Sequence, residues 1–325
     1  MKKFLGLSTL SLLIPFVANA HIGYVLSADE IAQGKGADFP YLLQVFQDSR
    51  NIWIMIITVL VVVLIGLFWK KIFIVKSQVG IIRHNISSYY EFIPWILRLS
   101  LGIALIGAGS AQILVSPSLS GFAGLATLQI LLGFLLMAGF LLPIVAPVVL
   151  VLSLYALSKN IYLLGNFDFI ASSFALLVLA NPRPGVDDIL GIHFYSLFKK
   201  LRNYVPFILR IGIGVAMMYL AVYEKFLNPH LSEMVVYNFD LMSVINVPAN
   251  MWVFGAGAVE LLIALLLLLG LFTRLVSTIA FIVLSFSFFY FGEDVYSHIT
   301  LFGLLSILLI TGGGKFSLDN LLKRK

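Results

Sequence analysis

The feature that most constrains this chain is a stretch of sequence that occurs twice. Residues 93–104 read Ile-Pro-Trp-Ile-Leu-Arg-Leu-Ser-Leu-Gly-Ile-Ala, and residues 205–216 read Val-Pro-Phe-Ile-Leu-Arg-Ile-Gly-Ile-Gly-Val-Ala. Farther along, a constant offset aligns Gln129 with Glu260 and Asp188 with Asp319. Self-similarity of this kind indicates two copies of one structural unit, so the sequence predicts a tandem duplication.

The two copies differ in charge. Gln112 and Gln129 of the first copy align with Glu224 and Glu260 of the second copy. The first copy is therefore neutral where the second is ionisable. This difference predicts that the function resides in the second half of the chain.

The composition is that of a membrane protein. Hydrophobic residues make up 61% of the chain, charged residues make up 11%, and the mean hydropathy is +1.04. Soluble domains are about 45–50% apolar and about 25% charged. Residues 1–20 resemble a secretory signal, with two lysines, an apolar run and an Ala-Asn-Ala cleavage pattern, so the mature chain is expected to begin at His21.

Residues 52–69 and eight later apolar segments are long enough to span a bilayer or nearly so. We therefore predict an all-α polytopic membrane protein with about nine transmembrane helices after a cleaved signal peptide, forming two fused, parallel four-helix bundles. The predicted segments are a signal peptide (1–20), an external segment (21–51), an anchor helix (52–69), a cytoplasmic connector (70–92), a first repeat (93–190) and a second repeat (205–322).

The distribution of basic residues predicts the orientation. With the mature N-terminus outside, fifteen Lys and Arg residues fall on the cytoplasmic side and four fall outside. This asymmetry satisfies the positive-inside rule and places the C-terminus in the cytoplasm, as in a bacterial-type cytoplasmic (inner) membrane. The net charge of +6 then faces anionic lipid headgroups, so nucleic acid is not needed as a partner.

The chain contains no cysteine. Thiolate nucleophiles, disulfide exchange, Cys-ligated zinc and Cys-ligated iron–sulfur clusters are therefore excluded as properties of this chain. Any redox chemistry has to involve a cofactor, a quinone or a partner protein.

The second copy carries a group of motifs that resembles one family. The motifs are Arg210-x-x-x-Gly214, Glu224-Lys225-Phe226, Gly255-x-x-x-x-Glu260-Leu261 followed by a leucine-rich run to Arg274, and Gly312-Gly313-Gly314-Lys315-Phe316-Ser317-Leu318-Asp319. Together they resemble the DoxX/DoxD family of four-helix membrane proteins over about 205–322. The first copy resembles a degenerate member of that family. Because the family is named after a subunit of a thiosulfate:quinone oxidoreductase, the resemblance implies quinone as a cofactor and a link to respiration or sulfur oxidation.

Four ionisable residues of the second copy are candidates for the site. Glu260 lies near the middle of a predicted span, where a charge costs on the order of 2.5–3.5 kcal/mol, so it should face the bundle interior and have a partner. Lys225 is the preferred partner, because its long side chain can reach down from the helix end. Glu224 should point about 100° away from Lys225 around the helix and so face a different side. The position that aligns with Arg210 in the first copy is also an arginine, Arg98, although that copy lacks the two glutamates. This favours a structural role for Arg210.

Two histidines could form a metal site on the outer side. After cleavage, the α-amino group and imidazole of His21 would form a chelate suited to Cu(II), and His298 could supply a third nitrogen. Copper at the mature N-terminus is the minor alternative among the cofactors.

Three functions remain open at the level of sequence. The first is a membrane component of a quinone-linked respiratory or sulfur-compound oxidoreductase, with Glu260 as proton acceptor and an external or cytoplasmic redox subunit as partner. The second is a small-solute or metal-ion transporter. The third is a non-catalytic membrane assembly subunit, in which Glu260 and Gln129 are buried anchors that fix helix register.

Overall fold

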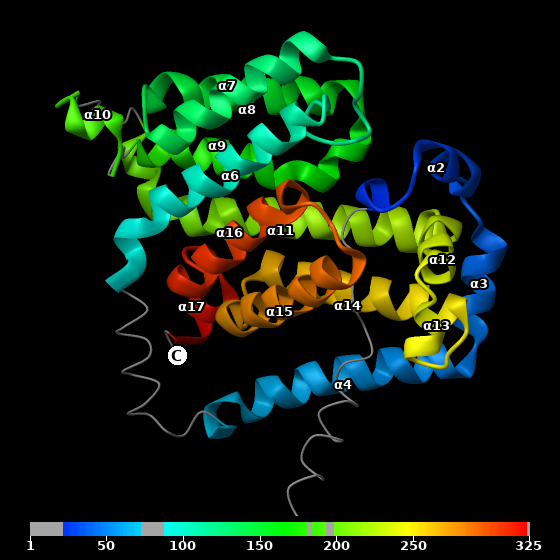
Figure 1. The fold of residues 1–325 in the computed structure, drawn as a ribbon. Helices are drawn as coiled ribbons and strands as arrows, with labels where there is room; N and C mark the ends of the chain where they lie inside the picture. The colour runs from blue at the N-terminus through cyan, green and yellow to red at the C-terminus, as the bar shows by residue number, and fades with distance from the viewer. Residues whose placement is uncertain (1–21, 73–87, 181–183, 193–197, 324–325) are drawn as a thin grey trace, which may run out of the picture.

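The computed structural model describes residues 22–72, 88–180, 184–192 and 198–323. These residues form helices and contain no β-strand, only a single bridge between Ile113 and Ser120 (Figure 1). The first bundle comprises α6 (Ile93–Ser110), α7 (Ala123–Ala138), α8 (Leu142–Lys159), the short η4 (Ile161–Asn166) and α9 (Phe167–Leu179). The second bundle comprises α11 (Val205–Leu220) with its extension η6 (Ala221–Leu227), α14 (Ala249–Leu269), α15 (Thr273–Phe291) and α16 (Val295–Thr311).

Six helical segments of the described chain are long and apolar enough to cross a membrane. They are 89–110, 142–159, 161–179, 199–227, 249–269 and 273–291. Three further apolar helices are shorter over their described residues, at 49–60, 123–138 and 295–311, and the first of these belongs to α4 (Ser49–Ile72). The prediction of an all-α polytopic membrane protein is confirmed. The predicted signal peptide lies outside the described residues.

The two bundles have the same internal arrangement. In each, the first helix packs on the second, the second on the third, the third on the fourth, and the fourth back on the first. Between the bundles the pairing is reciprocal, because α6 packs on α16 and α9 packs on α11 (Figure 1). One continuous apolar core runs through both bundles. The helix contacts between the two bundles are therefore reciprocal.

Corresponding backbone hydrogen bonds occur in the two bundles at the ends of α7 and α14. The helices α7 and α14 end at Gly139 and Gly270, both with φ +66°, which a residue with a Cβ adopts less readily. Each glycine carbonyl accepts a hydrogen bond from the backbone N–H of an acid, Asp187 (3.1 Å) or Asp319 (3.0 Å). The equivalent of Asp319 is thus Asp187. The constant offset, which had aligned Asp188, slips by one residue here.

The side chains of these two aspartates accept hydrogen bonds from backbone N–H groups at the start of the next long helix. Asp187 accepts from the N–H of Leu141 (3.0 Å) and of Leu142 (3.4 Å). Asp319 accepts from the N–H of Phe272 (2.8 Å) and of Thr273 (2.9 Å). Helix N-termini leave such donors without partners, so each acid satisfies the start of α8 or α15.

One end of the molecule is covered by short helices. They are η2 (Ile22–Tyr24), α2 (Ala28–Gly34), α3 (Phe39–Gln47), α12 (Pro229–Asn238) and α13 (Leu241–Val244). We call this the capped end; it has its own apolar core, in which Ile22 packs with Leu231, Val235 and Trp252. In Figure 1 α3 crosses the ends of the long helices at the right.

The opposite end carries η3 (Ser88–Phe92), α10 (Val186–Ile189), η5 (Lys199–Tyr204) and α17 (Leu318–Lys323). We call it the arginine end, because Arg98 and Arg210 lie there.

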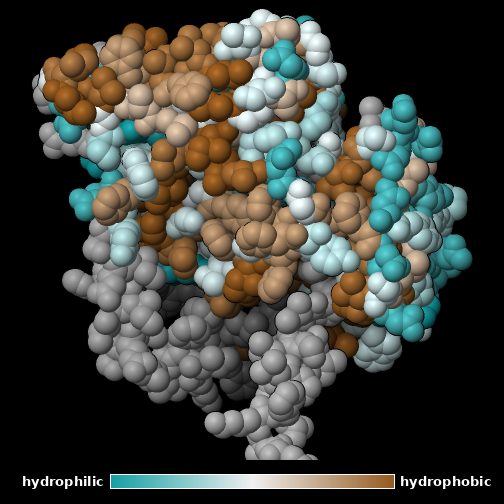
Figure 2. Space-filling view, viewed as in Figure 1, coloured by the Kyte–Doolittle hydropathy of each residue, from teal (hydrophilic) through white to brown (hydrophobic). Residues whose placement is uncertain are grey.

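The surface agrees with a bilayer environment. Large apolar side chains such as Leu131, Phe134 and Val151 point outward from the first bundle and are more than half exposed. Figure 2 shows apolar residues over the bundles and a concentration of hydrophilic residues at the capped end. A surface of this kind is stable in lipid and costly in water.

Candidate functional site

Three charged side chains meet inside the second bundle near the capped end. The Nζ of Lys225 lies 2.9 Å from Oε2 of Glu224 and 3.2 Å from Oε2 of Glu260. All three residues are buried, with exposed fractions of 0% for Glu224, 2% for Lys225 and 4% for Glu260. We call this group the acid–lysine cluster. The predicted contact between Lys225 and Glu260 is confirmed.

The expectation that Glu224 and Lys225 face different sides is wrong. Residues Ala221–Leu227 form a π-helical turn that extends α11. A π-turn is wider than an α-turn and has more residues per turn, so side chains are displaced from their α-helical directions. Glu224 and Lys225 consequently form an ion pair with each other although they are neighbours in sequence.

A glycine allows this turn to approach α14. A Cβ built at Gly257 would lie 2.8 Å from Cβ of Lys225 and 3.0 Å from the ring of Phe226. Gly257 precedes Glu260 by three residues, so both lie on one face of α14. The absence of a side chain at Gly257 is what lets Lys225 sit beside that face.

Glu224 also has partners from outside the second bundle. The hydroxyl of Tyr162, in η4 of the first bundle, donates a short hydrogen bond to Oε1 of Glu224. The backbone N–H of Ile22 donates to the same oxygen (3.2 Å). The cluster is therefore enclosed by both bundles and by the segment that follows position 21. Sequence reasoning missed Tyr162 and Ile22, because no local pattern marks either of them.

Glu260 is less completely satisfied. Its Oε1 has no hydrogen-bond partner among the described residues, whereas Oε2 contacts Lys225. Gln129, which the sequence alignment places opposite Glu260, is different. Its Oε1 accepts from the N–H of Val115 (3.0 Å), and its amide donates to the carbonyls of Leu105 (3.0 Å) and Ile113 (3.4 Å). The side chain of Gln129 thus bonds to backbone groups on both its oxygen and its nitrogen, whereas Glu260 has one carboxylate oxygen without a hydrogen-bond partner in the described chain.

A third buried acid lies within electrostatic range of this cluster. Glu293, in the connection between α15 and α16, is 9% exposed, and its Oε2 lies 3.4 Å from Nδ1 of His298. The Nδ1 of His298 also lies 2.6 Å from the hydroxyl of Ser297. Glu293 was missed because an acid between two apolar spans is ordinarily a solvent-exposed loop residue.

Arg210 lies far from this group in the fold, at the arginine end. Its guanidinium donates to the carbonyls of Leu267 (3.3 Å), Leu268 (3.0 Å) and Phe316 (3.0 Å). The structure thus brings together Glu260, Lys225 and Glu224 but does not bring Arg210 to them.

Arg98 has matching contacts in the first bundle. Its guanidinium donates to the carbonyls of Leu136 (2.9 Å), Met137 (3.1 Å) and Pro184 (2.8 Å). The same role in both bundles indicates that the two arginines tie the last turn of one helix to a neighbouring loop.

The residues proposed for a metal do not meet in the part of the chain described. His21 lies outside the described residues, and His298 is fully buried beside Ser297 and Glu293. The described residues contain no group of three His, Cys, Asp or Glu side chains that could hold a metal ion. A copper site that includes His21 stays a prediction.

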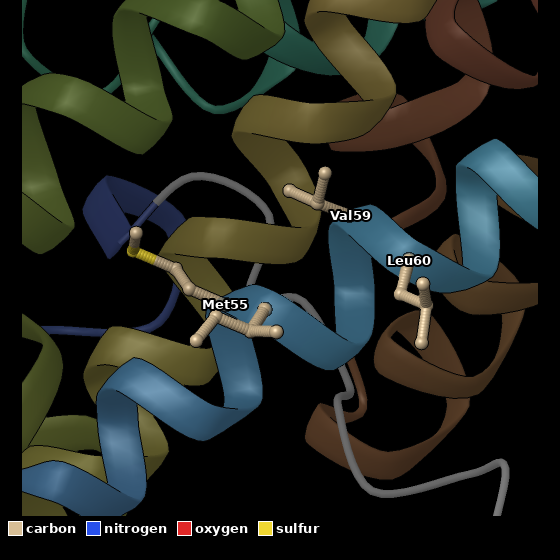
Figure 3. A pocket seen from close by; sticks show the side chains of 4 residues that line it. Met55, Val59 and Leu60 are labelled. Carbon is tan, nitrogen blue, oxygen red and sulfur yellow. The ribbon is translucent and has the colours of Figure 1, made fainter.

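An apolar groove of about 350 Å³ lies along α4. The described residues that line it are Met55, Ile56, Val59 and Leu60, and Figure 3 shows Met55, Val59 and Leu60 projecting from α4. The helices α4 and α14 contact each other and both begin at the capped end (Figure 1). At 1.5 Å per residue these groove residues lie about 9–17 Å along α4, and Glu260 lies about 17 Å along α14. The groove and Glu260 are therefore at a similar depth.

The segment that contains the acid–lysine cluster is similar in sequence to a known family. Residues 205–293 match the DoxX family model. This DoxX segment runs from the start of α11 to the connection before α16, so it contains the acid–lysine cluster and Glu293. The first bundle lies outside the match. Comparison with curated proteins and with solved structures gave no match.

Proposed function

We propose that this DoxX-like membrane protein is a component of a quinone-linked respiratory or sulfur-compound oxidoreductase system. In this proposal Glu260 accepts a proton at the quinone, and Lys225 adjusts the charge of Glu260. The observation that carries the proposal is Oε1 of Glu260, a buried carboxylate oxygen about halfway along α14 that has no hydrogen-bond partner in the described chain. Buried carboxylates in membrane spans are costly and tend to mark sites of proton or substrate exchange.

The alternative of a buried anchor is weakened by the first bundle. If Glu260 only fixed helix register, it should bond to backbone as Gln129 does at the corresponding position. Instead its one ion-pair partner in the described chain is the side chain of Lys225. An acid that contacts a lysine and has one oxygen without a hydrogen-bond partner can take up or release a proton, whereas an amide cannot.

The surroundings suit a quinone of the kind that respiratory membranes carry. The groove along α4 offers apolar surface for an isoprenoid tail at the depth of Glu260, and the unpaired Oε1 of Glu260 can accept a hydrogen bond from the hydroxyl of the reduced quinone, the quinol. A bound quinone would supply two-electron redox chemistry. Because the chain has no cysteine, the electrons are expected to come from or go to a redox subunit that binds one face of the protein.

Two further features of the protein belong to this proposal. The matching helix contacts and the matching roles of Arg98 and Arg210 support an origin of the two bundles by duplication, with a first copy that lost its acids. The distribution of Lys and Arg supports a bacterial-type inner membrane location with the capped end outside and the arginine end in the cytoplasm.

Binding of decylubiquinone in its reduced, quinol form to protein purified in mild detergent tests the function. The Glu260→Gln variant should bind reduced decylubiquinone about tenfold more weakly or worse, because it loses the hydrogen bond from the quinol hydroxyl to the carboxylate, and a hydrogen bond to a charged group is worth about 1.5–3 kcal/mol. Asp168→Asn is the matched control, since Asp168 is a buried acid of α9 in the first bundle. It should bind the quinone as the wild type does.

Other results would point elsewhere. Equal binding by the wild type and Glu260→Gln would contradict the proposed role of Glu260. Protein-dependent solute uptake into liposomes that needs Glu260, without quinone binding, would favour the transporter. The absence of both quinone binding and solute uptake would favour an assembly subunit.

A further inference from the structure

Glu293 is placed where an acid is usually exposed but is buried instead. It belongs to the three-residue connection between α15 and α16 at the capped end, and only 1% of its side-chain surface is accessible. Neither carboxylate oxygen has a hydrogen-bond partner among the described residues, although Nδ1 of His298 lies 3.4 Å from Oε2. A buried acid without hydrogen bonds is costly, so a structural role does not account for it.

The groups that face Glu293 belong to the acid–lysine cluster and to η2 of the capped end. Glu224 and Lys225 lie within electrostatic range of Glu293, and so does Tyr24 of η2. His298 is the fourth titratable neighbour. This region contains three buried carboxylates and one lysine, so the acids cannot all be charged at once without a large cost. At least one proton is expected to be shared among them.

We propose that Glu293 is the residue through which the acid–lysine cluster exchanges protons with the solution at the capped end. The inference rests on the proposed function in that Glu260 is taken as the proton-exchanging group. A proton that leaves Glu260 passes to the Glu224–Lys225 pair, which joins Glu260 through contacts of 3.2 and 2.9 Å. The pair passes a proton on to Glu293, and Glu293 releases one proton outward for each proton that Glu260 gives up, so one proton is transferred and no electron moves at this step.

The position of Glu293 suits this role. It lies outside the candidate membrane-spanning segments, directly beyond the end of α15, and its neighbour in the sequence, Asp294, is exposed. Burial raises the pKa of Glu293 to about 8. A group whose pKa lies near the working pH transfers protons efficiently in both directions.

The test is a pH jump on the protein in nanodiscs, followed by the infrared carboxyl band of Glu260. That band is identified by its loss in Glu260→Gln. In Glu293→Gln the Glu260 band should still titrate but about 100-fold more slowly, the lower range of what a positioned acid or base contributes. Glu293→Asp should keep part of the rate, and Asp294→Asn, which removes the exposed neighbouring acid, should keep all of it.

The outcomes separate the two proposals. A Glu260 band that responds equally fast in the wild type and Glu293→Gln would overturn the role of Glu293 and leave the proposed function standing. A wild-type Glu260 carboxyl that never titrates would overturn both.

A second measurement covers the case in which a variant folds poorly. Because the pKa of Glu293 is raised on folding, its contribution to stability is full below its ordinary value and is lost as the pH rises toward about 8. Wild-type protein should therefore become less stable between about pH 5 and pH 8, and Glu293→Gln should reduce that slope. An unchanged slope would show that Glu293 does not hold the proton, which would overturn the inference.

Discussion

At the scale of single residues, Lys225 is the group on which the cluster depends. It is fully buried and, among the described residues, it is the lysine that contacts both Glu224 and Glu260. Removing one partner of a buried ion pair is far more costly than the pair itself is stabilising, because the remaining charge has no compensation.

Lys225→Met should therefore destabilise the protein by about 3–5 kcal/mol. The double variant Lys225→Met with Glu224→Gln should recover part of this loss, since fewer buried acids lack a counter-ion. Thermal unfolding in detergent measures both. A loss below about 1 kcal/mol in the single variant would mean that the acids are already neutral, since an unpaired buried charge costs more than that.

The two arginines give a second prediction at this scale. Arg210→Met and Arg98→Met each remove a charged donor to backbone carbonyls, and each loss should cost on the order of 3 kcal/mol. Binding of decylubiquinone to the folded fraction should not change, because neither arginine approaches the cluster. Weaker binding by Arg210→Met, measured on protein that is still folded, would place Arg210 in the site after all.

At the scale of elements, the π-turn is the feature that makes the site. The sequence could predict that Lys225 reaches Glu260, because helix depth and side-chain length are readable from spacing. It could not predict that Glu224 joins them, since that prediction assumed an α-helix through Ala221–Leu227. Glu293 and Tyr162 escaped prediction for a related reason, because their burial depends on how distant elements close over them.

Deleting Val222 should convert the π-turn toward an ordinary α-turn. The directions of Glu224 and Lys225 would then separate, so the ion pair between them should be lost. We expect lower stability and weaker decylubiquinone binding than in the wild type. Deleting one residue from the loop at Asn238–Asp240, outside the turn, is the control. If the Val222 deletion kept full binding, the π-turn would not be needed.

The capped end offers a prediction about pH. His230 contacts Glu233 (2.9 Å) and Asp38 (3.1 Å), which links α12 to the start of α3. The hydrogen bond to Glu233 chiefly raises the pKa of His230, and the backbone N–H of Tyr41 chiefly lowers the pKa of Asp38. The contribution of His230 is full below its ordinary pKa and is lost as the pH rises through the raised value. The contribution of Asp38 is lost only as the pH falls through its lowered value.

Residues 22–47 should thus be held most firmly in mildly acidic solution. Limited proteolysis of this segment should become faster from about pH 6 to pH 8, because protonated His230 is lost over that range. His230→Gln should reduce this dependence. A cleavage rate that rises equally in the variant would assign the effect to other groups.

At the scale of the whole molecule, the architecture was largely predictable. The repeated Ile/Val-Pro-x-Ile-Leu-Arg motif and the apolar spans indicated two four-helix units, because membrane spans need long apolar segments that stand out in sequence. The pairing of α6 with α16 and of α9 with α11 depends on surface shape and was not predictable in detail.

The orientation can be tested because the chain has no cysteine. A cysteine at Lys35, at the capped end, should react with a membrane-impermeant maleimide in intact cells. A cysteine at Leu321, which is 57% exposed at the arginine end, should react only after the membrane is permeabilised. The reverse pattern would contradict the predicted topology.

The proposed function requires that the second bundle holds a quinone beside Glu260. It is tested most directly by mass spectrometry of the protein purified gently with its native lipids, counting extracted quinone per chain. We expect near-stoichiometric quinone in the wild type, depleted quinone in Glu260→Gln and retained quinone in Asp168→Asn. Native lipids retained without quinone, or equal quinone in the wild type and Glu260→Gln, would contradict it.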